Sequence, residues 1–150
     1  MGGLMPEGIS GARIITNAFP VKIKQYFRIK FSNKVGIREA KEEWRHILGA
    51  AIHDLEQLNY TPKDELHIVV YKFHLKAKYA DPDNFTTVLI TDILRDSFLL
   101  KDDTYQDVVQ VTCGVYDKKH QGTEIILLPF SELINHPKLL PSIIKGKQNN

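Results

Sequence analysis

The stretch LHIVVYKFHLK, residues 66–76, decides the fold class of this chain. Its first half is apolar on both alternating faces, which is typical of a strand in the middle of a sheet. In its second half one face stays apolar, while the other carries Lys72, His74 and Lys76. The pattern predicts a central strand that becomes basic toward its end. Functional residues gather where strands end and loops begin, so the segment that follows is the first place to look for a site.

Two pairs of aspartates follow that strand, in Asp81-Pro82-Asp83-Asn84 and in Lys101-Asp102-Asp103. Carboxylates held together repel unless they take up a proton or share a cation, and magnesium prefers oxygen ligands. A helix predicted over residues 85–98, with Asp83 or Asn84 as its cap, would separate the pairs by ~20 Å at ~1.5 Å per residue. A shared metal site therefore requires that the chain turn back after Leu100 or that two subunits contribute. The alternative is an ordinary helix-cap turn and a solvated acidic loop.

A basic segment precedes these acids. Residues 21–31 alternate apolar and cationic side chains, which predicts a half-buried strand. The cations of its outer face are Lys22, Lys24, Arg28 and Lys30. The segment carries no acid, so contact with a phosphate backbone is a hypothesis beside the simpler interpretation of a solvated face.

The other elements follow from periodicity. Residues 37–58 carry an apolar stripe at helical spacing. Strands are predicted over 106–116 and 123–129, joined as a hairpin by 117–122, and Ser131 is expected to cap a short helix. We expect a flexible lead over 1–10, a single domain over 11–136 and a loosely ordered basic tail over 137–150. The fold class is α/β (α+β), with a small mixed sheet of about four strands packed against two main helices.

The overall composition restricts the classes of protein to which this chain can belong. With 150 residues, 43% of them hydrophobic, and a net charge of +2, the chain is expected to form a domain with a substantial core. No apolar run approaches the ~20 residues of a membrane helix, so no membrane partner is expected. Cys113 is the only cysteine, which excludes an internal disulfide and a thiolate zinc site. The first residues lack the pattern of a secretory signal, and we expect a cytoplasmic location.

The spacing of the acids resembles that of a known family. The residues concerned are Asp81-Pro82-Asp83-Asn84, Asp92 within Thr91-Asp92-Ile93-Leu94, and Leu100-Lys101-Asp102-Asp103 before a Val-rich strand. Over residues 66–128 this pattern resembles the RusA family of Holliday-junction resolvases, the crossover junction endodeoxyribonucleases. The resemblance implies a bacterial or phage-encoded α/β homodimer that cuts four-way DNA junctions with Mg²⁺, or with Mn²⁺ in its place, in DNA recombination and repair.

The resemblance also implies roles for particular residues. Carried over by position, the catalytic metal ligands are Asp81, Asp83 and Asp103, with Asp102 beside them. The lysine that the family usually carries three residues after the motif asparagine is Thr87 here. The substitute cations would be Lys76, Lys78 or Lys101. The residues expected to contact the DNA backbone are Lys22, Lys24, Arg28, Lys30, Lys72 and Lys76.

Two other functions stay open at this point. Because of Thr87, the chain is alternatively a catalytically impaired RusA-like protein that binds branched DNA or a regulatory partner without cutting. It is otherwise an interaction domain whose acids form a solvated surface.

Overall fold

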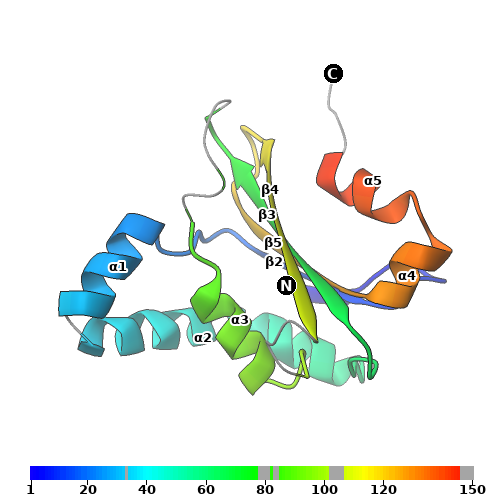
Figure 1. Ribbon diagram of the computed structural model, residues 1–150, viewed down its shortest axis with the longest axis horizontal. Helices are drawn as coiled ribbons and strands as arrows, with labels where there is room; N and C mark the ends of the chain where they lie inside the picture. The colour runs from blue at the N-terminus through cyan, green and yellow to red at the C-terminus, as the bar shows by residue number, and fades with distance from the viewer. Residues whose placement is uncertain (33, 78–81, 83–84, 102–106, 146–150) are drawn as a thin grey trace.

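The computed structural model describes residues 1–32, 34–77, 82, 85–101 and 107–145. A mixed sheet of five strands, in the order β1-β2-β5-β3-β4, runs through its middle (Figure 1). All neighbouring strands are antiparallel except β3 and β4, which are parallel. The strands are β1 Gly2–Leu4, β2 Ala12–Thr16, β3 His67–Leu75, β4 Val108–Tyr116 and β5 Gly122–Pro129.

The predicted central strand is confirmed, because β3 lies between β5 and β4. The predicted hairpin is wrong: β4 and β5 are not neighbours, and each pairs with β3 from its own side. The burial of the two strands gives the reason. Every residue of β5 is buried, so β5 requires a strand on each side, whereas β4 alternates with exposed residues and takes the edge of the sheet.

Two helices cover one face of the sheet, α2 Lys34–Gln57 and α3 Val88–Asp96 (Figure 1). The helix expected over 37–58 is confirmed, and its apolar stripe enters the larger core cluster together with residues of α3. Helix α3 is also the crossover between the parallel strands β3 and β4, as parallel pairing requires. In the described ranges, no helix combines the length and the apolarity needed to cross a bilayer.

Two short helices, α4 Phe130–Asn135 and α5 Leu139–Lys145, pack on the opposite face of the sheet (Figure 1). The predicted short helix is therefore present, but it begins at Phe130 with Pro129 rather than Ser131 as its N-cap. The tail expected from residue 137 is helical over α5. Apolar side chains of α5 pack against the core cluster formed by Ile68, Val70, Ile126 and Leu128, and this burial holds the helix on the sheet.

The strand expected over 21–31 is a helix, α1 Ile23–Ser32. Its apolar residues Ile23, Phe27 and Phe31 are spaced by four, which satisfies an alternating pattern and a helical one equally well. A short segment of this kind cannot be assigned from periodicity alone. On a helix only Lys24 and Arg28, four residues apart, share a face, so the predicted four-cation strand face does not form.

The N-terminal lead contributes a strand, β1, in place of the expected flexible segment. It pairs with β2, and the N–H of Gly2 donates to Oδ2 of Asp54 on α2 at 3.1 Å. A Cβ atom at Gly2 would collide with the carbonyl oxygen of Ala51. The missing side chain of Gly2 therefore lets β1 lie directly on the backbone of α2.

Candidate functional site

The aspartates of the two acidic pairs lie outside the described residues. The residues that flank each pair in the sequence are described. The residues outside the described part include Asp81, Asp83, Asp102, Asp103 and the candidate cation Lys78. The flanks are Pro82 and Phe85 for the first pair, and Lys101 and Asp107 for the second. These flanking residues place the two ends of each acidic segment.

The first segment is anchored over the end of the parallel strands. A Cβ atom added at Gly114 of β4 would lie 3.3 Å from Cβ of Pro82. Phe85 packs between two rings, with centroid distances of 4.9 Å to Phe73 and 5.3 Å to Phe19. Pro82 and Phe85, which flank Asp83 and Asn84 in the sequence, are therefore held close to the C-terminal ends of β3 and β4.

The basic segment is attached to the same place. Lys22 forms an antiparallel bridge with Phe85, and the N–H of Thr86 donates to the carbonyl of Val21 at 2.9 Å. The start of α1 therefore lies beside the chain that leaves Asp81-Pro82-Asp83-Asn84, although about sixty residues separate them in the sequence. Lys22, Lys24 and Arg28 are exposed there, while the side chain of Lys30 lies outside the described part.

The flanks of the second acidic pair lie at the other end of the strands. Lys101 is ion-paired with Asp64, three residues before β3 begins. The carbonyl of Asp107 accepts a hydrogen bond from the N–H of His67, the first residue of β3, at 2.8 Å. From Val108 to Gly114, six residues at ~3.3 Å each span ~20 Å. The described flanks of the two pairs are thus ~20 Å apart within one chain.

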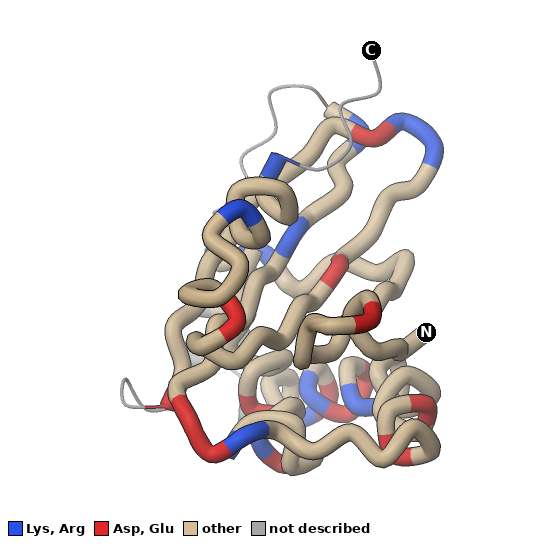
Figure 2. Tube along the Cα trace, turned by 90° about the vertical axis from the view of Figure 1, so that its right-hand side faces the viewer, with Lys and Arg blue, Asp and Glu red and all other residues tan. Residues whose placement is uncertain are grey.

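The remaining cations predicted to contact DNA differ in their surroundings. Lys76 is exposed just after β3, and Lys and Arg also colour most of the β4–β5 connection at the upper right (Figure 2). Lys72 is only 6% exposed, and its Nζ donates to the carbonyl of Ile143 near the end of α5 at 2.7 Å. The charge of Lys72 is therefore engaged in holding α5 on the sheet.

Thr87, at the position where the resembling family is expected to carry lysine, is the N-cap of α3, in place of the predicted Asp83 or Asn84. Its hydroxyl donates to Oε1 of Gln110 on β4 at 2.9 Å. Its carbonyl accepts from the hydroxyl of Thr91 at 3.0 Å. Thr87 thus ties the start of α3 to the edge strand and supplies no positive charge.

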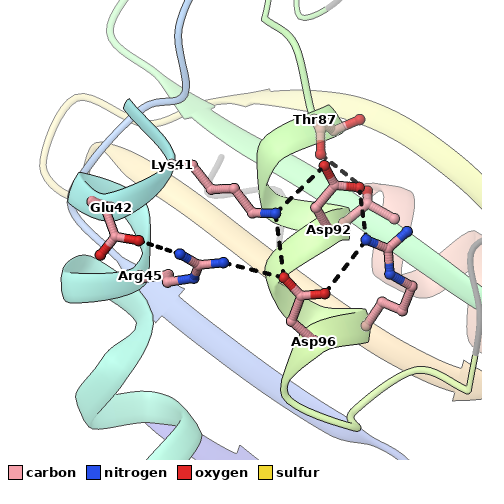
Figure 3. Close-up of polar contacts among 8 residues, drawn as sticks. Lys41, Glu42, Arg45, Thr87, Asp92 and Asp96 are labelled. Carbon is pink, nitrogen blue, oxygen red and sulfur yellow. Dashed lines mark hydrogen bonds and ion pairs between the residues drawn. The ribbon is translucent and has the colours of Figure 1, made fainter. Parts of the chain in front are cut away.

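Asp92, which belongs to the resembling pattern, lies in a charge network between α2 and α3 (Figure 3). Lys41 Nζ lies 3.3 Å from Asp96 and 4.0 Å from Asp92, and Arg45 reaches Asp96 at 3.3 Å. Partial burial opposes ionisation of Asp96, but hydrogen bonds from Lys41 and then from Arg45 and Arg95 lower its pKa. The positive charges of this network are paired with its carboxylates, so its ion pairs join α2 to α3.

A further polar group escaped the sequence analysis. On the α4/α5 face, Glu124 of β5 accepts from Arg13 Nε at 2.8 Å and contacts His74 Nε2 at 2.9 Å. The other ring nitrogen of His74 lies 3.3 Å from Asp117. Arg13, His74 and Glu124 line a cleft of about 470 Å³ beside the β4–β5 connection. The signal in the sequence was a single acid inside the otherwise apolar run 123–129.

Neither this group nor any other in the described part of the chain places three His, Cys, Asp or Glu side chains so that they could hold a metal ion. In the group around His74 the reason is geometric, because the two carboxylates bind opposite nitrogens of one ring.

Comparison of the chain with protein-family models finds no match, and comparison with curated proteins finds none either.

Proposed function

We propose that this chain is a magnesium-dependent endodeoxyribonuclease that cleaves four-way DNA junctions in the manner of the RusA family. The observation that carries the proposal is the bridge between Lys22 and Phe85. It joins the acid-free basic segment to the residue directly after Asp81-Pro82-Asp83-Asn84. A cation-binding loop beside a phosphate-binding surface is the arrangement that metal-dependent cleavage of a polyanion requires.

The donor chemistry of the motif fits the metal. Asp81, Asp83 and Asp103, with Asp102 adjacent, offer carboxylate oxygens, the ligands that Mg²⁺ prefers, and Mn²⁺ accepts the same set. When bound, the ion lowers the pKa of a coordinated water and neutralises charge on the scissile phosphate. Pro82 fixes its own φ and biases Asp81 toward an extended backbone, which limits how far the two carboxylates can diverge.

The basic residues would hold the DNA backbone without selecting a sequence. Lys22, Lys24 and Arg28 lie along the start of α1, which is bridged to Phe85 after the acidic motif, and Lys76 precedes that motif at the end of β3. Lys76 is also the preferred substitute for the lysine that is missing at position 87. It directly follows β3 and lies shortly before the acidic motif in the sequence. Lys101 is paired with Asp64 at the opposite end.

A nicking assay on a synthetic four-way junction tests the proposal. We expect the parent protein to cut with Mg²⁺ and not with a chelator present. Asp81→Asn should abolish cutting and keep or tighten junction binding, because a negative charge near the phosphates is removed. Glu43→Gln is the matched control, since it removes the same charge at an exposed position of α2. Equal cutting by Asp81→Asn and the parent would show that the ligands are assigned wrongly.

The second candidate is a protein that binds branched DNA without cutting it. The hydrogen bond from Thr87 to Gln110 favours this function, because it fills the position of the usual lysine with a neutral group that has a structural role. Junction binding without any metal-dependent nick would select it. If neither Mg²⁺ nor DNA shifts the melting temperature, the acids form a solvated surface only, because a ligand of the native state must stabilise that state.

A further inference from the structure

The cleft beside the β4–β5 connection lies on the α4/α5 face of the sheet. Phe85, which follows the acidic motif, packs in the core cluster of the opposite face. The residues that line the cleft come from β2 and the residue after it, from His74 of β3, from the start of β5 and from the connection itself. Its volume of about 470 Å³ falls in the range of small-molecule sites, about 300–1,000 Å³. The cleft is therefore a candidate binding site that the proposed nuclease function does not use.

Close packing and hydrogen bonds fix the walls of this cleft. A Cβ atom at Gly122 would collide with the carbonyl oxygen of Thr16, so the glycine lets the connection enter β5 directly beside the end of β2. Within the connection, Oδ1 of Asp117 accepts the N–H groups of Lys119 and His120, each at 3.0 Å. A cleft whose walls are fixed in this way needs little ordering when a ligand binds, which favours affinity.

The charges that line the cleft favour an anionic ligand. Among the described residues of the lining, Arg13 and Lys119 are the cations and Glu124 is the one acid. Glu124 is only 6% exposed, and its two oxygens are engaged by Arg13 Nε at 2.8 Å and by His74 Nε2 at 2.9 Å. This buried acid orients the guanidinium of Arg13 through Nε, and the two terminal nitrogens can then donate to a pair of phosphate oxygens.

The uncharged part of the lining suits a flat heterocycle. Ile15, two residues after Arg13 and on the same face of β2, is 46% exposed and gives the cleft an apolar surface. Asn17 and Gln121 add side-chain amides, each of which carries donors and an acceptor. Such an amide can bond to the N6 and N7 atoms of adenine together. A ligand that joins a heterocycle to a phosphate therefore matches both parts of the lining.

We propose that this cleft binds a nucleoside monophosphate. Arg13 and Lys119 bind the phosphate, and Glu124 positions Arg13. Ile15 contacts the face of the base. This binding needs no metal ion and goes beyond the proposed cleavage of junctions. The same chemical unit occurs as a free nucleotide and as an unpaired nucleotide within a DNA strand, and the experiments below distinguish these two sources.

Isothermal titration of the parent protein with AMP, adenosine and inorganic phosphate tests the class of ligand. EDTA is present throughout, so that a metal ion at the acidic motif cannot recruit the nucleotide. We expect one AMP site per chain, with AMP bound at least ~10-fold more tightly than adenosine or phosphate, because only AMP engages both parts of the lining. AMP that binds no more tightly than phosphate overturns the proposal, and so does the absence of AMP binding.

Variants of the lining test the location of the site. Arg13→Gln and Lys119→Gln should each weaken AMP binding by at least ~10-fold, because each removes a charged donor to the phosphate. Lys119→Gln keeps the turn, since the bond to Asp117 comes from the backbone N–H of residue 119. Arg38→Gln is the matched control, because it removes the same charge at an exposed position of α2, across the sheet. Losses no larger than that of Arg38→Gln overturn the assignment of the cleft.

Competition with a single-stranded oligonucleotide of adenines separates the two sources of the nucleotide. Displacement of AMP by the oligonucleotide supports the site with a DNA strand as the source, and retention of AMP supports it with a free nucleotide as the source. The site and the proposed nuclease can fail separately. A parent protein that nicks junctions but binds no AMP overturns only the site. One that binds AMP in EDTA but never nicks a junction with Mg²⁺ overturns only the nuclease.

Discussion

Replacing Phe85 by alanine removes the aromatic anchor that holds the acidic loop to the sheet. The ring of Phe85 lies between Phe73, which is fully buried, and Phe19, with centroids 4.9 and 5.3 Å away. The backbone of Phe85 also carries the bridge to Lys22. Both the stability of the domain and the position of the proposed site therefore depend on this side chain.

The expected loss in the free energy of unfolding is about 2–3 kcal/mol. A fully buried phenylalanine truncated to alanine costs about 3–5 kcal/mol, and Phe85 is only partly buried. Each aromatic pair contributes about 0.5–1.5 kcal/mol beyond its buried area, and two such pairs are lost. A loss of this size should lower the urea midpoint by about 1–2 M.

Urea unfolding and junction nicking, measured on the same samples, check the prediction. Phe98→Ala is the matched control, because Phe98 is 83% exposed and its truncation should change stability by less than ~0.5 kcal/mol. At urea-free conditions, where the variant stays folded, Phe85→Ala should nick at least ~10-fold more slowly than the parent, since misplaced ligands lose transition-state stabilisation. A change in stability no larger than that of Phe98→Ala would refute the packing argument, and unchanged nicking would refute the anchoring argument.

Two further predictions concern stability. Phe98 has a φ of 61°, so Phe98→Gly should raise the free energy of unfolding by about 0.5–1 kcal/mol relative to Phe98→Ala, measured by urea unfolding, and equal stabilities would contradict the strain. The pKa of Asp117 is below its ordinary 3.8, mainly because its carboxylate accepts the N–H of His120, and then the N–H of Lys119 and a contact with His74. Asp117 therefore stabilises the fold above about pH 4, and this contribution is lost as the pH falls through the lowered pKa. The urea midpoint of Asp117→Asn should be below that of the parent at pH 6 and approach it at pH 3, and a constant gap would exclude this linkage.

Long elements with a clear period could be predicted from the sequence. The apolar stripe of α2 is long and has a helical period, and the apolar run of β3 continues into an alternating pattern, so both were predicted within a few residues of their observed bounds. Residues 23–31 satisfied two patterns, and the helix was missed. The strand neighbours were also missed, because the loop 117–121 connects β4 and β5 without pairing them.

The candidate site, like the fold, could be predicted from the sequence only in part. The acidic and basic residue types, and their resemblance to a nuclease family, can be read from the sequence. The attachment of Lys22 to Phe85, the engagement of Lys72 with α5 and the group around Glu124 join residues that are far apart along the chain. No local pattern contains such contacts.

The sequence by itself determined a mixed α and β domain with acids grouped after a central strand. Only the tertiary structure decided that β3 separates β4 from β5 and that the flanks of the two acid pairs lie at opposite ends of a parallel strand pair. The physical reason is that periodicity reports which side of an element is buried, whereas the neighbours of a strand are chosen by the burial of the whole sheet. β5, buried along its full length, had to lie inside the sheet, and β4 was left at the edge.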